Sequence, residues 1–145
     1  MKDSRPDPKL ADFTFKTYDK VRYGDTDRQG HVNNAVFATF LESGRCEFLD
    51  HVFGPDWRKQ GGSFVIVRLE VDFRAEIFWP GRVEIGTSVM RVGTSSLRTY
   101  QALFQGEKLV ATAEGVLVFL DSDKRSRPLQ APEREKLNAL MHPCA

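Results

Sequence analysis

One long apolar helix pattern constrains the fold of this chain more than any other feature. The segment AVFATFLESGRCEFLDHVF, residues 35–53, carries apolar residues at helical spacing, at Phe37, Phe40, Leu41, Gly44 and Phe48. Val36 and Leu49 widen this surface beyond a single stripe, so the helix should be covered on most sides. Asn33 or Asn34 suits the N-cap position, where a side-chain oxygen accepts hydrogen bonds from free backbone N–H groups.

Segments on both sides of this helix alternate between apolar and polar residues, the pattern of half-buried strands. One such segment precedes the helix, at residues 13–23. Four follow it: the clearest at 65–77, and three more at about 82–93, 96–105 and 108–121. Short turns join the last four, which predicts an antiparallel meander, and the single apolar helix needs one sheet to lie against. The expected fold class is α+β, with a curled antiparallel sheet wrapped around a long central helix.

The length of 145 residues fits a single domain that spans residues 1–145. Residues 1–12 read as a flexible leader, and residues 123–145 as a tail with a short helix that begins near Pro132. The polar start does not resemble a signal peptide, and no run of 18 apolar residues predicts a membrane span. Cys46 and Cys144 fit neither a metal site nor a disulfide framework, which favours a reducing, cytoplasmic compartment.

The charge balance argues against partners bound by bulk electrostatics. A net charge of +1, from 21 basic and 20 acidic residues, gives no support to binding of nucleic acid or of a membrane surface. An anionic ligand would need a local cluster of cations. An open sheet leaves an edge strand, so we expect the chain to associate with itself through that edge.

The loop between the first strand and the helix, YGDTDRQGHVNN at residues 23–34, concentrates polar residues between two apolar elements. It places carboxylates just before the N-terminus of a buried helix, where free N–H groups stabilise negative charge on a ligand. Hydrolysis of an ester or thioester needs this combination. One group attacks or activates water, and the other takes up the charge of the tetrahedral intermediate.

GDTDRQGHVNN and the Glu42–Arg45 sequence on the helix resemble the 4-hydroxybenzoyl-CoA thioesterase-like family of hotdog proteins. The FVIVR segment at 64–68 and GTSS at 93–96 also fit, so the resemblance covers about residues 12–122. It implies a hotdog fold and hydrolysis of an acyl-CoA thioester to a free acid and CoA. It further implies no metal and no cofactor beyond the CoA of the substrate, and a homodimer or homotetramer with active sites at subunit interfaces.

The resemblance also implies roles for individual residues. Asp27 would be the nucleophile or the general base, and both routes stay open. The backbone N–H of Asn34 would face the thioester carbonyl as the oxyanion site, and Gly30 would permit the backbone turn into the helix. Basic residues near the end of the last strand meet the CoA phosphates in this family, and Arg125 and Arg127 stand in the comparable place.

Other polar residues are expected to support the site. His31 should order the loop and, with Asn33, contact the substrate, although a role as general base is an alternative for His31. Ser95 and Ser96 either contact the pantetheine arm or form a plain turn. Asp25 should hold the loop by accepting hydrogen bonds from backbone N–H groups. The two aspartates and His31 lack a second cluster that would complete a metal site.

Glu42 lies three residues before Arg45, a spacing that predicts an ion pair on the helix surface. A second group of hotdog thioesterases carries a catalytic glutamate on this helix, and the ion pair is the preferred interpretation here.

Two other functions stay open at this point. A hotdog enoyl-thioester hydratase or dehydratase needs an acid–base pair, for which His31 could be recruited. A non-catalytic hotdog protein would bind acyl-CoA without turnover. The acyl chain is not specified by the sequence, and a carrier-protein thioester could replace the CoA thioester.

Overall fold

The computed structural model describes residues 5–145. Its elements are η1 (Leu10–Asp12), β1 (Phe15–Lys20), η2 (Tyr23–Asp25), α1 (Asn34–Phe53), β2 (Ser63–Phe73), β3 (Arg82–Val92), β4 (Ser96–Gln105), β5 (Lys108–Leu120) and α2 (Ala131–Asn138), where η marks a 3-10 helix. The predicted long helix, the three predicted strands over 82–121 and the C-terminal helix are confirmed. Of the leader predicted over residues 1–12, residues 1–4 lie outside the described residues, and η1 forms its last turn.

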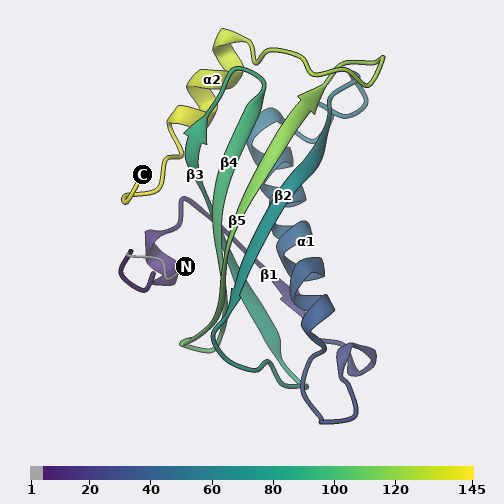
Figure 1. The fold of residues 1–145 in the computed structure, drawn as a ribbon, viewed down its shortest axis with the longest axis vertical. Helices are drawn as coiled ribbons and strands as arrows, with labels where there is room; N and C mark the ends of the chain where they lie inside the picture. Colours follow the sequence, from purple (N-terminus) through teal and green to yellow (C-terminus); the bar gives the residue numbers. More distant parts are fainter. Residues whose placement is uncertain (1–4) are drawn as a thin grey trace.

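The strands form one antiparallel sheet in the order β1-β3-β4-β5-β2. Figure 1 shows the strands twisting past one another, with α1 lying lengthwise against one face of the sheet and α2 beside its upper end. The expected curled antiparallel sheet with a long helix, the hotdog arrangement, is therefore confirmed. None of the helices that the structure describes combines the length and apolarity needed to cross a membrane.

The predicted meander of four strands is wrong in its first member. β3, β4 and β5 follow one another as a meander, but β2 pairs with β5, for example Phe73 with Ala111. β1 occupies the edge of β3, where Lys20 faces Arg82. Because that edge is taken, β2 joins the opposite edge of the sheet, and residues 74–81 cross the end of the sheet to reach β3.

The strand predicted over 65–77 begins and ends earlier than expected, at Ser63 and Phe73. The backbone N–H groups of Arg74 and Ala75 both donate to the carbonyl oxygen of Val110, at 2.9 and 3.2 Å. Sharing one acceptor ends the regular ladder and turns the chain toward the helix, which buries Ile77 completely.

The apolar faces of two strands also differ from the prediction. A register shift between Ile66 and Arg68 breaks the alternation of β2, and Val65 and Val67 are exposed. The first strand covers only Phe15–Lys20, because the chain continues into η2, where Tyr23 is 73% exposed.

Helix α1 packs closely on the sheet because its buried face contains a glycine. A Cβ at Gly44 would lie 2.5 Å from Cγ2 of Ile85, far inside van der Waals contact. The buried residues of α1 are Phe37, Phe40, Leu41, Gly44, Arg45, Phe48, Leu49 and Val52. The helix is covered on the face toward the sheet, whereas Thr39 and Glu42 on its outer face are exposed, so the expectation of a helix covered on most sides is met only in part.

A polar layer separates the core beneath α1 into two apolar clusters. Gln101 on β4 donates through Nε2 to the Leu41 carbonyl oxygen and to Thr87 Oγ1, both at 3.0 Å, and its Oε1 accepts from Arg45 at 3.3 Å. One cluster lies toward the start of α1 and the other toward its end. The helix is thus fixed lengthwise by hydrogen bonds as well as by apolar contact.

The ion pair predicted between Glu42 and Arg45 does not form among the described residues. Glu42 is exposed, whereas Arg45 is 4% exposed and turned toward Gln101. Removal of the guanidinium from water lowers the pKa of Arg45, and Glu42 offsets only part of this effect. The three-residue spacing of Glu42 and Arg45 therefore predicted the wrong partner. Arg45 belongs to the buried row of the helix that contains Leu41 and Leu49.

Candidate active site

The loop before α1 is held by Asp25, whose side chain is buried. Its carboxylate accepts the backbone N–H of Arg22 at 2.8 Å and Nη2 of the Arg22 guanidinium at 2.9 Å. The Asp25 carbonyl oxygen accepts the N–H of Asn33 at 2.9 Å. The predicted structural role of Asp25 is confirmed, and it ties both ends of the loop together.

Asp27 opens a tight turn that fixes its own carboxylate. Oδ1 accepts the N–H of Gln29 at 2.9 Å, and the Asp27 carbonyl oxygen accepts the N–H of Gly30 at 3.1 Å. Gly30 has φ of 86°, in the left-handed region that favours glycine. The Asp27 N–H then donates to the His31 carbonyl oxygen at 2.9 Å, which closes the turn. Oδ2 is left facing the His31 ring.

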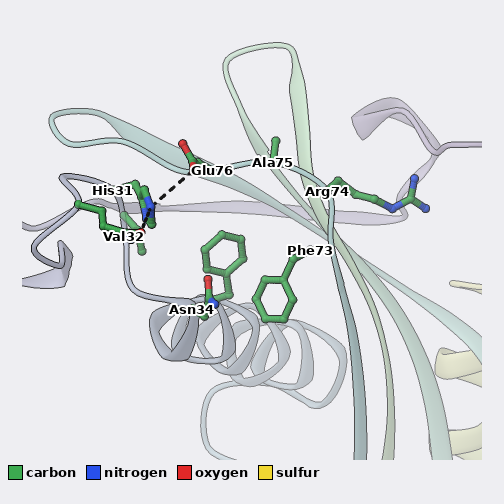
Figure 2. Close-up of a pocket in the computed structure, with 9 residues that line it drawn as sticks. His31, Val32, Asn34, Phe73, Arg74, Ala75 and Glu76 are labelled. Atoms are coloured by element: carbon green, nitrogen blue, oxygen red, sulfur yellow. Dashed lines mark hydrogen bonds and ion pairs between the residues drawn. The ribbon is translucent and has the colours of Figure 1, made fainter.

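His31 lies between two carboxylates. Its Nδ1 is 3.5 Å from Asp27 Oδ2, and its Nε2 is 3.5 Å from Oε1 of Glu76, the contact drawn as a dashed line in Figure 2. Nε2 also lies 2.9 Å from Oε1 of Gln29. The His31 side chain is 17% exposed. The arrangement places the imidazole between Asp27, which is 29% exposed, and Glu76, which is 58% exposed.

The helix begins at the same place. Asn33 is the N-cap, and its Oδ1 accepts the N–H of Ala35 at 3.0 Å. Asn34 is the first helical residue, and its backbone N–H donates to no acceptor within residues 5–145. The N–H of Val32 donates to the Ile77 carbonyl oxygen at 2.8 Å, which ties the entrance of the helix to the segment after β2. The free N–H group of Asn34 thus lies at the positive end of the helix dipole.

A cavity of about 390 Å³ lies between this loop and the segment after β2. Figure 2 shows Asn34 on one side, at the start of the helix, and Phe73 to Glu76 along the other. Phe37 and Phe73 give the cavity an apolar wall, with ring centroids 5.0 Å apart. Its lining residues are Gln29, His31, Val32, Asn34, Phe37, Phe73, Arg74, Ala75 and Glu76. Such a site suits a chain-like ligand with a polar carbonyl group near Asn34.

The structure brings together five of the residues singled out from the sequence, namely Asp27, Gly30, His31, Asn33 and Asn34. Four others lie elsewhere in the protomer, at Ser95, Ser96, Arg125 and Arg127. These four are near the end of β5 and the turn between β3 and β4, at the end of the sheet opposite the loop (Figure 1). Helix α1, which runs between the two ends, has 20 residues. At 1.5 Å per residue it separates the ends by about 30 Å.

Some of the four residues at the opposite end of the sheet already make local contacts. Arg127 makes a two-pronged ion pair with Glu133 at 2.9 Å, which raises the pKa of Arg127 and lowers that of Glu133. The Ser95 carbonyl oxygen accepts the N–H of Phe119, and the Ser96 carbonyl oxygen accepts the N–H of Gly93. Arg125 is exposed.

Sequence reasoning missed the residues that face the loop across the cavity. Phe73, Arg74 and Glu76 come from the end of β2 and the segment after it. Arg74 and Glu76 alternate with Phe73, Ala75 and Ile77 as the wet face of a strand does, so the sequence held no signal that separated them from ordinary strand residues. The shared hydrogen bonds of Arg74 and Ala75 to the Val110 carbonyl oxygen, which end the regular β2 ladder, are what turn them toward the cavity.

No group of three or more His, Cys, Asp or Glu side chains in the described part of the chain is arranged to hold a metal ion. Cys46 and Cys144 are both free thiols.

Comparisons with known proteins agree on one family. The sequence model of the Thioesterase-like superfamily matches residues 21–139. The chain is 32% identical over 119 residues to an acyl-acyl carrier protein thioesterase of Arabidopsis thaliana, which covers 78% of this chain and 61% of the plant protein. It is 30% identical over 131 residues to the 1,4-dihydroxy-2-naphthoyl-CoA hydrolase of Synechococcus elongatus, covering 86% of this chain and 93% of that one.

Among solved structures, a thioesterase of Thermus thermophilus in complex with coenzyme A and zinc superimposes with a TM-score of 0.78 at 35% identity. That match covers 88% of this chain and 93% of the other. The chain spans only about three fifths of the plant relatives that it matches.

Proposed function

Because this chain belongs to the Thioesterase-like superfamily, we propose that it hydrolyses an acyl-CoA thioester to a free carboxylic acid and CoA. The observation that carries the proposal is the meeting of an open helix N-terminus at Asn34 with the Asp27–His31 pair beside one cavity. The relatives named as a CoA thioester hydrolase and as a thioesterase bound to coenzyme A support the reaction class.

In the proposed reaction the thioester carbonyl oxygen points at the backbone N–H of Asn34. Negative charge develops on this oxygen as the tetrahedral intermediate forms. A preorganised N–H donor and the positive end of the α1 dipole stabilise that charge more in the transition state than in the ground state. No side chain is needed for this task, which is consistent with the use of the Asn33 side chain as a helix cap.

Asp27 supplies the other half of the chemistry, by one of two routes. As general base, it takes a proton from the water that attacks the carbonyl carbon. As nucleophile, it attacks the carbonyl itself, and the resulting mixed anhydride is hydrolysed by water. In both routes the thiolate of CoA leaves when the tetrahedral intermediate collapses. A single turnover in ¹⁸O-labelled water identifies the second route when water attacks the Asp27 carbonyl carbon of the anhydride, because the label then enters the Asp27 side chain, which the first route never labels.

Neither route calls for a metal or a further cofactor, so we propose that the reaction uses none. A reducing, cytoplasmic compartment stays a prediction, in keeping with the two free cysteines.

We further propose that the active unit is a homodimer joined by its β2 edges. β2 is an edge strand, and large apolar side chains are exposed along it: Val65, Ile66, Val67 and Phe73 are 42%, 40%, 58% and 52% exposed. Antiparallel pairing of two β2 strands would set the start of one beside the end of the other. Arg125, Arg127 and the 93–96 turn of one protomer would then approach the cavity of its partner, which accounts for their distance from Asp27 within one chain.

The decisive experiment is release of free thiol from short, long and aromatic acyl-CoA thioesters by wild type and by Asp27→Asn. We expect the variant to keep its fold and to lose at least about 100-fold in rate, as for removal of a general base or nucleophile. Asp56→Asn serves as the matched control, since Asp56 is exposed and its carboxylate pairs with the exposed Lys59. Failure of the wild-type protein to release thiol from every thioester would sink the proposal, and hydration of an enoyl-CoA without thiol release would favour a lyase.

A further inference from the structure

Arg74 forms the outer wall of the candidate active-site cavity, across from the start of α1. Figure 2 shows its side chain extending away from Asn34 and past β2, so that the guanidinium lies beyond the outer rim of the cavity. Its backbone N–H donates to the Val110 carbonyl oxygen at 2.9 Å, which anchors the residue to the sheet. Among the described residues that line the cavity, Arg74 is the only lysine or arginine.

The counter-ion of Arg74 is Asp7, from the segment before β1. Asp7 Oδ1 lies 2.8 Å from Arg74 Nη1, and the two side chains are 69% and 34% exposed. Exposed carboxylate–guanidinium pairs are weak, because water and salt screen them. A phosphate offers a guanidinium more acceptor oxygens and more charge than a carboxylate does. A phosphate can therefore displace the Asp7 carboxylate from the Arg74 guanidinium.

We propose that Arg74 binds the phosphate at the end of the phosphopantetheine arm of the substrate, in place of Asp7. This inference rests on the proposed thioester hydrolysis, which puts the scissile carbonyl at Asn34. From there the pantetheine arm follows the cavity of about 390 Å³ toward its outer side, where Arg74 lies. The same phosphate chemistry occurs in CoA and in the prosthetic arm of an acyl carrier protein.

The other charges around the cavity define where the phosphate can lie. Glu76 is 58% exposed on the same segment and would repel a phosphate placed near His31. Arg74 stands two residues away from Glu76, at the side farther from the helix start (Figure 2). A phosphate is thus favoured only beyond Glu76, which sets the distance between phosphate and thioester. Arg127 of the same protomer does not compete with Arg74 for this phosphate. Its guanidinium is paired with Glu133 and lies at the opposite end of the sheet.

The test measures binding of three ligands that share one arm: pantetheine, 4′-phosphopantetheine and CoA. Calorimetry on wild type and Arg74→Gln should give a Kd at least about five-fold higher in the variant for the phosphorylated ligands, the size expected when one charge-assisted contact is lost. Pantetheine should bind both proteins equally. Asp7→Asn should lower the Kd of the phosphorylated ligands, because it removes the competing carboxylate.

The matched control is Arg82→Gln. Arg82 is an exposed arginine at the same end of the sheet, paired with Glu84 at 2.7 Å, and it does not line the cavity. This variant should leave all three Kd values unchanged, which separates a local contact from general attraction of anions. High salt should weaken CoA binding to the wild type more than to Arg74→Gln.

Each outcome decides the matter. Equal losses for 4′-phosphopantetheine and CoA support the inferred contact with the phosphate that CoA and carrier proteins share. A loss for CoA alone overturns it and places the contact at the nucleotide phosphates of CoA. Equal effects on pantetheine, or no effect on any ligand, overturn the inference. Because binding is measured without turnover, a protein that binds CoA through Arg74 and releases no thiol would refute the proposed hydrolysis and leave the phosphate contact standing.

Discussion

At the scale of single residues, Gly44 shows how closely the helix approaches the sheet. Replacement by alanine adds a Cβ that would lie 2.5 Å from Ile85 Cγ2 and 3.0 Å from Gln101 Nε2. Overpacking of a core costs about 1–3 kcal/mol, and the better helix propensity of alanine returns about 1 kcal/mol. We therefore expect Gly44→Ala to lower the free energy of unfolding by about 1 kcal/mol and by no more than about 2 kcal/mol, measured by urea denaturation.

A substitution on the exposed face of the same helix provides the comparison. Thr39 is exposed, so Thr39→Ala gains helix propensity without a clash and should stabilise by a few tenths of a kcal/mol. Equal stability of Gly44→Ala and wild type would show that the helix can move away from the sheet freely.

His142 makes stability depend on pH. His142 is 4% exposed, its ring lies 5.1 Å from the rings of both Phe13 and Tyr100, and Nε2 has no hydrogen-bond partner within residues 5–145. Burial lowers the pKa of His142; Asp12 opposes this effect and Arg5 adds to it.

In the unfolded chain the same histidine titrates near its ordinary pKa of about 6.5. As pH falls through that value, the unfolded state binds a proton that the folded state does not, so the free energy of unfolding falls. Above it, this contribution to the pH dependence vanishes. His142→Asn should flatten the curve of unfolding free energy against pH between about 7 and 5, as followed by denaturation at several pH values. A slope equal to that of wild type would contradict the assignment.

At the scale of elements, the start of α1 links stability to the proposed chemistry. Asn33→Ala removes the side-chain acceptor of the Ala35 N–H and should cost about 1 kcal/mol of unfolding free energy. The first turn then frays, so the Asn34 N–H is less well oriented, and we expect thiol release to fall by several-fold in kcat. Asn138→Ala, at the last residue of α2, is the control for a substitution at a helix end away from the cavity. A loss of stability with kcat unchanged would separate capping from the proposed oxyanion site.

The elements themselves were largely predictable, because their signals are local. The period of α1, its N-cap and the alternation in β3 to β5 involve residues within a few positions of one another. The pairing of β2 with β5 was not, because it depends on β1 having taken the edge of β3. Strand periodicity carries no information on which edge is free.

The same distinction applies to the site. Asp27, Gly30, His31, Asn33 and Asn34 are consecutive in one loop, so a sequence motif can reveal them together. Arg74 and Glu76 reach the cavity through a tertiary turn about 40 residues later, and Arg45 is buried by its helix row in spite of its charge.

At the scale of the whole molecule, the proposed β2–β2 dimer can be tested at its centre. Val67 is 58% exposed on this edge strand, and lysine there is a common device against edge pairing. We expect Val67→Lys to shift the protein from dimer to monomer in sedimentation or light scattering, with loss of thiol release if the partner completes the site.

The opposite edge of the sheet offers a matched control. Tyr18 on β1 is also 58% exposed, and Tyr18→Lys should leave the assembly unchanged. Dissociation of the dimer by both variants, or by Tyr18→Lys alone, would contradict an interface formed by β2.

The position of β2 at the far edge of the sheet has a consequence for synthesis of the chain. Its pairs with β5 run from Phe73↔Ala111 to Ser63↔Leu120, so the two strands are separated by about 40 to 60 residues. At about 5–20 residues per second, a ribosome exposes β2 for several seconds before its partner emerges. During that interval an apolar strand has both edges free. Chaperone capture or premature pairing of nascent chains on one message should therefore centre on Ser63–Phe73, and folding should be limited by the late arrival of β5.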